Sequence, residues 1–249
     1  MGGRVRIWWI MLYIAVVDIK ESFSSVALYA HGWKSGELLG VRTVRGRFSD
    51  RGEGAARSVK EAIEQLSPVE PEVILLLPRS LVHVTNAEIP AKNQTLLKKM
   101  MEFEIARHFP IAREELVYDY MVVEKPAPDR EGFIVNLAGL KRADFDAYLK
   151  AAEEAGLNVA EVSYSSVAWV RPEPGDASEE KRCFIDIAPE GFELSVVDGS
   201  RLLYSRFSRF RPKVEEKCFY DKKAAAEPPS FRIADRITQE LDRVPLVSG

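Results

Sequence analysis

The sequence contains little cysteine and little histidine, which most metal sites and many redox sites require. Among 249 residues there are two cysteines and three histidines. Cys183 and Cys218 form no Cys-x-x-Cys pair, so we expect two reduced thiols, with a structural disulfide as the alternative. His31, His83 and His108 are far apart in the chain, and we therefore expect no metal site.

Sequence motifs for catalysis are also absent. The chain has no Gly-x-Ser-x-Gly, His-Glu-x-x-His or P-loop pattern. Catalysis by an activated nucleophile or by a protein-bound metal therefore has little support.

An excess of one charge is absent too. Lys and Arg number 35 and Asp and Glu 38, which gives a net charge of -3. This balance provides no general attraction to nucleic acid or anionic lipid. The hydrophobic fraction of 46% is enough for one large domain or two modest ones.

The chain lacks a long hydrophobic run. The stretch Ile7–Val17 is apolar, but a membrane-spanning helix needs about 20 residues. Asp18 and Lys20 follow it instead of a small-residue cleavage site. We predict that Tyr13–Asp18 is a buried strand of a soluble chain, with Met11 as a candidate natural start.

What the sequence does contain is a regular succession of strand and helix patterns. The predicted strands are Tyr13–Ile19, Ser24–His31, Glu37–Arg47, Glu72–Leu77, an extended piece ending at Pro90, Val117–Val122, Phe133–Leu140, Val159–Tyr164, Cys183–Ile187, Glu193–Asp198 and Arg201–Phe207. The predicted helices are Gly54–Leu66, Gln94–His108, Asp144–Ala155, a short one at Ser165–Val170, and a last one beginning at Ser230. The Pro-, Gly- and acid-rich stretch Arg171–Lys181 predicts a linker.

Two aspartates form the sharpest candidate site. Asp18 and Asp186 each end the first strand of a three-strand meander. In actin-like ATPases and sugar kinases, two such hairpins hold a Mg²⁺-nucleotide: the turns bind phosphate through backbone N–H groups and the carboxylates organise the metal. Ser24 and Ser25 are candidate donors to phosphate.

The turns after these aspartates depart from that pattern. A tight turn favours glycine after the aspartate, but Lys20 follows Asp18-Ile19, and Ala188-Pro189 follows Asp186-Ile187. We also expect the first turn to be long. The alternative interpretation is two strand-end aspartates that bind no ligand.

A basic and aromatic run begins at Arg201, with the sequence RLLYSRFSRFRPK. Basic residues that alternate with aromatic ones can bind single-stranded nucleic acid. A strand of period two gives the same pattern, and the acidic balance of the chain favours the strand. We expect no nucleic-acid partner.

Three stretches of the sequence resemble the PilM-like proteins of type IV pilus assembly and the related GspL cytoplasmic domains of type II secretion. They are the Asp18 strand pair, the segment from Ile89-Pro90 through FEIARHFPIAREELVYDYMVV, and LKRADFDAYLKAAEEAGL followed by VSYSSVAWVRP and FIDIAPEGFELSVVDGSRLLYSRF. The resemblance covers about residues 12 to 245.

This resemblance implies an α/β fold of the actin-like (ribonuclease H-like) type with two domains. Residues 1–170 would form domain I, including a small inserted α+β subdomain at about 80–159. Residues 171–181 would be the linker, and 182–249 a shortened domain II.

The resemblance also implies a function. Members act as cytoplasmic scaffolds, peripheral to the inner membrane, that bind the N-terminal tail of a bitopic PilN-like or GspM-like protein and contact the membrane only through that partner. We expect weak or lost binding of ATP with Mg²⁺. The alternative is an active actin-like ATPase or phosphotransferase that holds Mg-ATP with Asp18 and Asp186.

Overall fold

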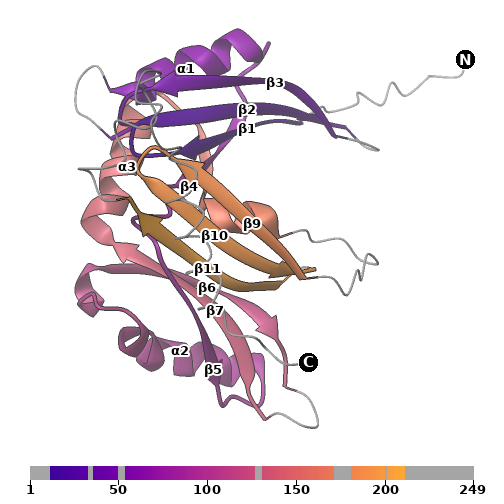
Figure 1. The fold of residues 1–249 in the computed structure, drawn as a ribbon, viewed down its shortest axis with the longest axis vertical. Coiled ribbons are helices and arrows are strands. Elements are labelled where there is room, and N and C mark those ends of the chain that lie inside the picture. The colour runs from indigo at the N-terminus through magenta and orange to yellow at the C-terminus, as the bar shows by residue number, and fades with distance from the viewer. Residues whose placement is uncertain are drawn as a thin grey trace, which may run out of the picture. The chain divides into compact units, whose positions relative to one another are not determined.

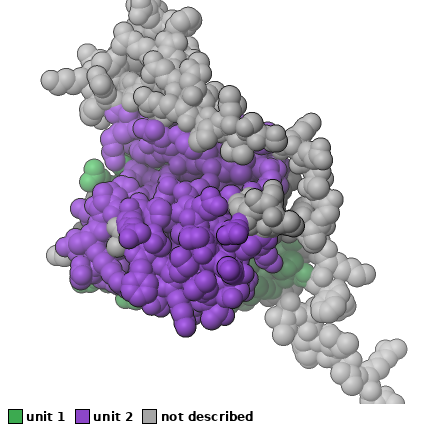
Figure 2. All heavy atoms as spheres, turned by 90° about the horizontal axis from the view of Figure 1, so that it is seen from below, with its two compact units in different colours: residues 1–78, 143–165 green, residues 79–142, 166–249 purple. Residues whose placement is uncertain are grey.

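A computed structural model describes residues 12–32, 36–49, 54–126, 131–170, 181–199 and 201–210. The chain divides into two compact units (Figure 2). Unit 1 comprises residues 1–78 and 143–165, and unit 2 comprises residues 79–142 and 166–249.

Unit 1 is built on a five-stranded sheet. Across the sheet the strands are β3 (Gly36–Arg45), β2 (Phe23–His31), β1 (Leu12–Ile19), β4 (Glu72–Leu77) and β8 (Val159–Tyr164). The first three form an antiparallel meander, and β4 and β8 continue the sheet parallel to β1. The three successive strands predicted at the start of the chain are confirmed as this meander.

The predicted strand at Tyr13–Asp18 is confirmed as β1, in the middle of this sheet. Ala15, Val17 and Ile19 on β1 are fully buried, and so are Val26 and Leu28 on β2. A central strand is covered by neighbours on both sides, which explains its almost continuous apolar sequence. None of the helices among the described residues is long and apolar enough to cross a membrane.

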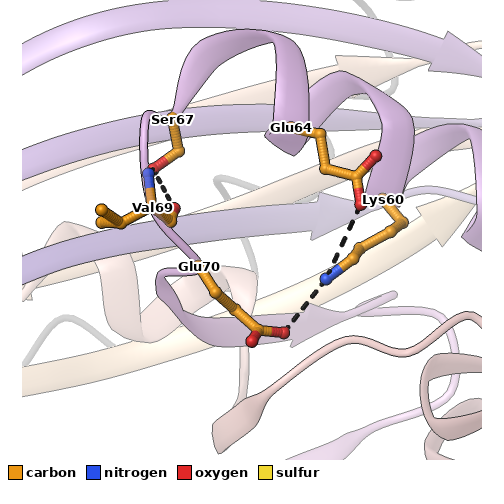
Figure 3. A network of polar contacts seen from close by, with 5 residues as sticks. All are labelled: Lys60, Glu64, Ser67, Val69 and Glu70. Carbon is orange, nitrogen blue, oxygen red and sulfur yellow. Dashed lines mark hydrogen bonds and ion pairs between the residues drawn. The ribbon is translucent and has the colours of Figure 1, made fainter.

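Helix α1 (Ala55–Leu66) packs on β2 and β3 through a stripe that includes the buried residues Val59 and Ile63. Ser67 follows the last residue of the helix as its C-cap, and its backbone N–H donates to the Ile63 carbonyl at 2.8 Å. Lys60, within the helix, forms an ion pair with Glu70, which lies between the helix and β4: its Nζ is 3.1 Å from Glu70 Oε1 (Figure 3).

Helix α3 (Arg142–Glu154) connects to β8 through a glycine cap. Gly156 has a φ of 72°, its N–H donates to the Glu153 carbonyl at 2.9 Å, and the Leu157 N–H donates to the Ala152 carbonyl at 3.0 Å. A left-handed residue at this position is favourable for glycine, which has no Cβ. A glycine directly after the predicted helix Asp144–Ala155 is typical of such a cap, and the structure confirms it.

Unit 2 contains two three-stranded antiparallel sheets (Figure 1). The first has the order β5 (His83–Ile89), β7 (Phe133–Lys141) and β6 (Leu116–Glu124), and the second has the order β11 (Arg201–Arg209), β10 (Gly191–Asp198) and β9 (Lys181–Ala188). Two short 3₁₀ helices complete the elements, η1 (Arg113–Glu115) and η2 (Ser165–Trp169), of which η2 begins at the last residue of unit 1.

Helix α2 (Gln94–His108) packs against the first of these sheets. Asn93 caps it, accepting a hydrogen bond from the Leu96 N–H at 2.9 Å. Leu97, Met101 and Ile105 are buried in one core with β5 and β7. The helical spacing of Leu97, Met101 and Ile105, with Phe103 nearby, predicts a wide apolar face that packs on more than one neighbour. Phe103 is however 72% exposed, so the buried stripe is narrower than this pattern predicts.

The boundaries predicted from sequence differ in places from the structure. Lys181 begins β9 and does not belong to the linker, whose remaining residues lie outside the described part of the chain, as does the predicted last helix. Residues 143–165 group with unit 1, although the inserted subdomain was expected to reach about 159. The assignment to two actin-like domains and a linker stays a prediction.

Candidate functional site

Asp18 lies near the end of β1, directly opposite Ser25 on β2. Its carboxylate oxygen Oδ2 is 3.1 Å from Nζ of Lys20, whose side chain is only 11% exposed. The two strands are joined by a three-residue turn, in which the Lys20 N–H donates to the Phe23 carbonyl at 2.8 Å. The expectation of a long turn is therefore wrong, because Ser24 and Ser25 are already strand residues.

The two serines differ in orientation because successive strand residues point to opposite faces. Ser24 is fully buried, and its Oγ finds no hydrogen-bond partner within the described ranges. Ser25 is partly exposed and shares a face with Asp18, its cross-strand neighbour. Only Ser25 therefore has its hydroxyl on the same face as the Asp18 carboxylate.

Asp186 lies on β9, the edge strand of the second sheet of unit 2, opposite Glu193 on β10. Its side chain is partly exposed. Asp186 belongs to unit 2 and Asp18 to unit 1, so each is placed within its own sheet. Nucleotide binding by these residues stays a prediction.

The geometry at Asp18 can be compared with what a Mg²⁺-nucleotide would require. A magnesium site needs carboxylate oxygens available to the ion or to its bound waters. Here the Lys20 ammonium group already lies beside the carboxylate, where it supplies the opposite charge that a metal would supply. The residues around Asp18 therefore fit an internal ion pair better than a metal site.

Metal-binding clusters are absent from the parts of the chain that the structure describes: no three His, Cys, Asp or Glu side chains gather there. Cys183 is a free cysteine at an exposed position of β9, and partial desolvation of its thiol raises the pKa of that group. Cys218 lies outside the described residues.

The sequence analysis missed a groove in unit 2 with a volume of about 430 Å³. It is lined by residues of the segment after Pro78, of β5, of the end of α2 and of β11. The walls include three aromatic rings, those of Phe109, Tyr204 and Phe207. We call this feature the β5–β11 groove.

A buried polar network lies behind one wall of the groove. The Arg79 guanidinium donates through Nε to Ser205 Oγ at 2.7 Å and through a terminal nitrogen to the Ser205 carbonyl at 2.8 Å. Ser205 Oγ is 2.6 Å from Ser166 Oγ, and the Ser166 hydroxyl donates to Glu193. Ser195 Oγ donates to the same Glu193 oxygen at 3.0 Å.

This network satisfies two ionisable groups that would otherwise be costly to bury. Arg79 is 8% exposed and Glu193 is 3% exposed. The contributing residues come from four segments, which are the stretch after Pro78, η2, β10 and β11, and Arg79 and Ser205 are 126 positions apart. The basic and aromatic run at Arg201 was interpreted as a strand, and the structure confirms it as β11. This run was the one signal in the sequence for part of the groove, because residues of β11 line it.

Comparisons with known proteins identify the fold. No protein-family model matches the chain, and no curated protein matches it in sequence. Among solved structures, the chain is similar to one described as a PilM-PilN type IV pilus biogenesis complex, with a TM-score of 0.67 and 16% identity over 95% of this chain and 76% of the other. It is also similar to the cytoplasmic domain of EpsL, an inner membrane component of the type II secretion system of Vibrio cholerae, with a TM-score of 0.55 and 16% identity over 79% of this chain and 71% of the other.

Both similarities concern the fold, because the identities are low. They confirm the resemblance to PilM-like proteins and GspL-type cytoplasmic domains that the sequence suggested. The chain has the actin-like α/β fold that the resemblance implied.

Proposed function

We propose that the chain is a scaffold of an inner-membrane assembly complex that serves a type IV pilus or a type II-like secretion system. The observation that carries the proposal is the similarity in fold, over 95% of the chain, to a structure described as a PilM-PilN complex. A similar fold in an inner membrane component of a secretion system supports the same class of function.

The partner in this proposal is a bitopic PilN-like protein whose N-terminal tail lies in the cytoplasm, with a GspM-like protein as the corresponding partner in a secretion system. The chain itself would be cytoplasmic and peripheral, and would contact the membrane only through that partner. In this role the chain needs a docking surface and no catalytic group.

Weak or lost nucleotide binding is part of the proposal. Its support is the Lys20–Asp18 ion pair at 3.1 Å, which neutralises the carboxylate that would organise Mg²⁺. In addition, a nucleotide-binding turn favours glycine after the aspartate, whereas Ile19 and Lys20 follow Asp18 here.

An active ATPase or phosphotransferase is the second candidate. The observation that favours it is that Asp18 and Ser25 share one face of the sheet at the end of β1. In that case Asp18 and Asp186 would be the residues that hold Mg-ATP.

Isothermal titration calorimetry with the N-terminal tail of the PilN-like candidate tests the proposed scaffold. We expect saturable binding with one tail per chain. A folded chain that releases no heat with the tail, at concentrations well above those of a micromolar complex, would contradict the proposal.

A further inference from the structure

Strand β3 (Gly36–Arg45) forms one edge of the five-stranded sheet of unit 1 (Figure 1). Within the described residues, β3 pairs with β2 on one side and with no strand on the other. An open edge of this kind can pair with another chain, and proteins often protect it with lysine or proline. β3 is ten residues long and contains neither.

Apolar side chains are exposed along this edge strand. Leu38 is 49%, Leu39 42% and Val41 50% exposed. On the neighbouring strand β2, by contrast, Val26 and Leu28 are fully buried. Isolated apolar residues on a surface are ordinary, but contiguous ones mark sites of protein association. Since three of them lie within four consecutive positions, β3 is a candidate contact with another chain.

A bulge in β3 brings two of these side chains to the same face of the sheet. The pairing shifts between Leu28 and Tyr29 of β2, so that Val41 lies opposite Ala27 and Leu38 lies opposite Tyr29. Ala27 and Tyr29 are two positions apart on a strand and therefore point to the same face. Leu38 and Val41 consequently share that face, and Tyr29, itself an exposed residue, extends the apolar surface that they form.

Helix α1 packs on the opposite face of β3. Gly40 lies opposite the buried Leu28, and a Cβ at Gly40 would come within 2.7 Å of a side-chain carbon of Leu66, the last residue of α1. Because Leu28 adjoins Tyr29 in β2, Gly40 faces away from Leu38. The face that carries the exposed apolar side chains is therefore the one that α1 leaves uncovered.

The charged side chains of β3 complement a second copy of the same strand. Glu37 lies opposite Ala30 and Arg42 opposite Val26, four positions apart on β2, so the two charged side chains share a face. Arg42 donates to the carbonyl of its neighbour Val41 at 3.0 Å, and neither Glu37 nor Arg42 forms an ion pair within the described residues. One β3 strand therefore offers an acid and a base, each open to the opposite charge.

We propose that two copies of the chain associate through β3, with the two edge strands antiparallel about a two-fold axis perpendicular to the sheet. The register places Glu37 opposite Arg42 of the other copy and Leu38 opposite Val41. Each pairing occurs twice because of the symmetry, and each joins side chains that share a face. Cross-strand pairs of opposite charge and pairs of apolar residues stabilise sheets, and a two-fold contact closes at a dimer.

Sedimentation velocity of the full chain, from about 1 to about 100 μM, tests the proposal over the range of weak to moderate affinities. Glu37→Arg and Arg42→Glu each place like charges opposite each other, and the double variant Glu37→Arg/Arg42→Glu restores opposite charges in the same register. The matched controls are Glu61→Arg and Arg57→Glu, at exposed positions of α1 in the same unit. Circular dichroism and the melting temperature verify that all variants fold.

We expect a reversible equilibrium between monomer and dimer for the native chain. Each single reversal in β3 should raise the dissociation constant about tenfold or more, because like charges directly opposite each other destabilise paired strands. The double variant should return the dissociation constant to within about threefold of the native value, and each control should change it by less than about twofold.

A native chain that stays monomeric over the whole range would overturn the dimer and leave the edge to a different partner. A dimer that the single reversals do not weaken, or that the double variant fails to restore, would show that the copies do not pair in this register. A mass that keeps rising with concentration would indicate open assembly, which a two-fold contact excludes. The dimer does not depend on the proposed scaffold function, so none of these results bears on binding of the PilN-like tail.

Discussion

At the scale of single residues, Glu193 is a buried ionisable group held by its neighbours. The residue is 3% exposed, and its carboxylate accepts hydrogen bonds from Ser166 and Ser195. Glu193→Ala leaves both hydroxyl groups without this acceptor, and we expect the free energy of unfolding to fall by about 3 kcal/mol. Glu193→Gln keeps an oxygen acceptor and should lose only about 1 kcal/mol.

Urea denaturation measures both changes. Glu153→Ala, at an exposed position of α3, is the control and should change the free energy by less than about 0.5 kcal/mol. Equal losses for Glu193→Ala and Glu193→Gln would show that the hydrogen bonds of the network do not stabilise unit 2.

Tyr148 is the residue that links stability to alkaline pH. Burial raises the pKa of its phenol above the ordinary value of about 10, a hydrogen bond with Ser49 lowers it, and the carboxylate of Glu21 raises it. The ring also stacks on Phe48, with centroids 6.0 Å apart.

Because the pKa of Tyr148 is higher in the folded state than in the unfolded state, its protonated form stabilises the fold. This contribution is fully present below pH about 10 and is lost as the pH rises from there through the folded pKa. We expect Tyr148→Phe to lose less stability than the native chain as the pH rises above about 10, the ordinary pKa of the phenol. Urea denaturation across this range measures it, and Tyr118→Phe, at an exposed tyrosine, should behave like the native chain.

At the scale of elements, the ring of Phe109, directly after α2, packs against Gly139 on β7. A Cβ at Gly139 would lie 2.8 to 3.0 Å from three ring carbons of Phe109, the residue that follows the helix. Contacts below 3.0 Å force the ring to move, and overpacking of this kind destabilises by about 1–3 kcal/mol.

We therefore expect Gly139→Ala to lower the free energy of unfolding by about 2 kcal/mol. Gly36→Ala is the control for stability, because a Cβ there meets nothing closer than 3.7 Å. A stability of Gly139→Ala equal to that of the native chain would contradict the tight fit.

Most elements could be predicted from the sequence because their patterns are local. The ends of β4, α2 and β8 agree with the prediction to the residue. Proline follows two of these elements closely, with Pro78 directly after β4 and Pro110 two positions after α2. Phe103 was predicted to pack but is exposed, because helical spacing shows that apolar residues share a face and does not show how much of the face is covered.

At the scale of the whole molecule, the question is whether the fold still binds nucleotide. Mg-ATP at 100 times its dissociation constant would stabilise the chain by about 2.7 kcal/mol, which raises the melting temperature by several degrees. With Lys20 beside Asp18, we expect millimolar Mg-ATP to raise it by less than about 1 °C.

Two variants make this thermal-shift measurement decisive. Lys20→Gly removes the internal cation and supplies the residue that a phosphate-binding turn favours, so it is the variant in which a shift is expected to return. A clear shift in the native chain that Asp18→Ala abolishes would instead establish the ATPase candidate.

The sequence by itself determined the order of strands and helices and the glycine at Gly156 that follows a predicted helix, because hydrophobic periodicity and turn residues act over a few positions. The class of fold was implied by the resemblance of three stretches to PilM-like proteins. The sequence placed Asp18 at the end of a strand but not the Lys20 ammonium group against its carboxylate, since that contact depends on the three-residue turn. Only the tertiary structure decided the β5–β11 groove. Its walls and the network behind them join Arg79 to Ser205 across 126 positions, and such pairings arise from the packing of whole sheets rather than from local pattern.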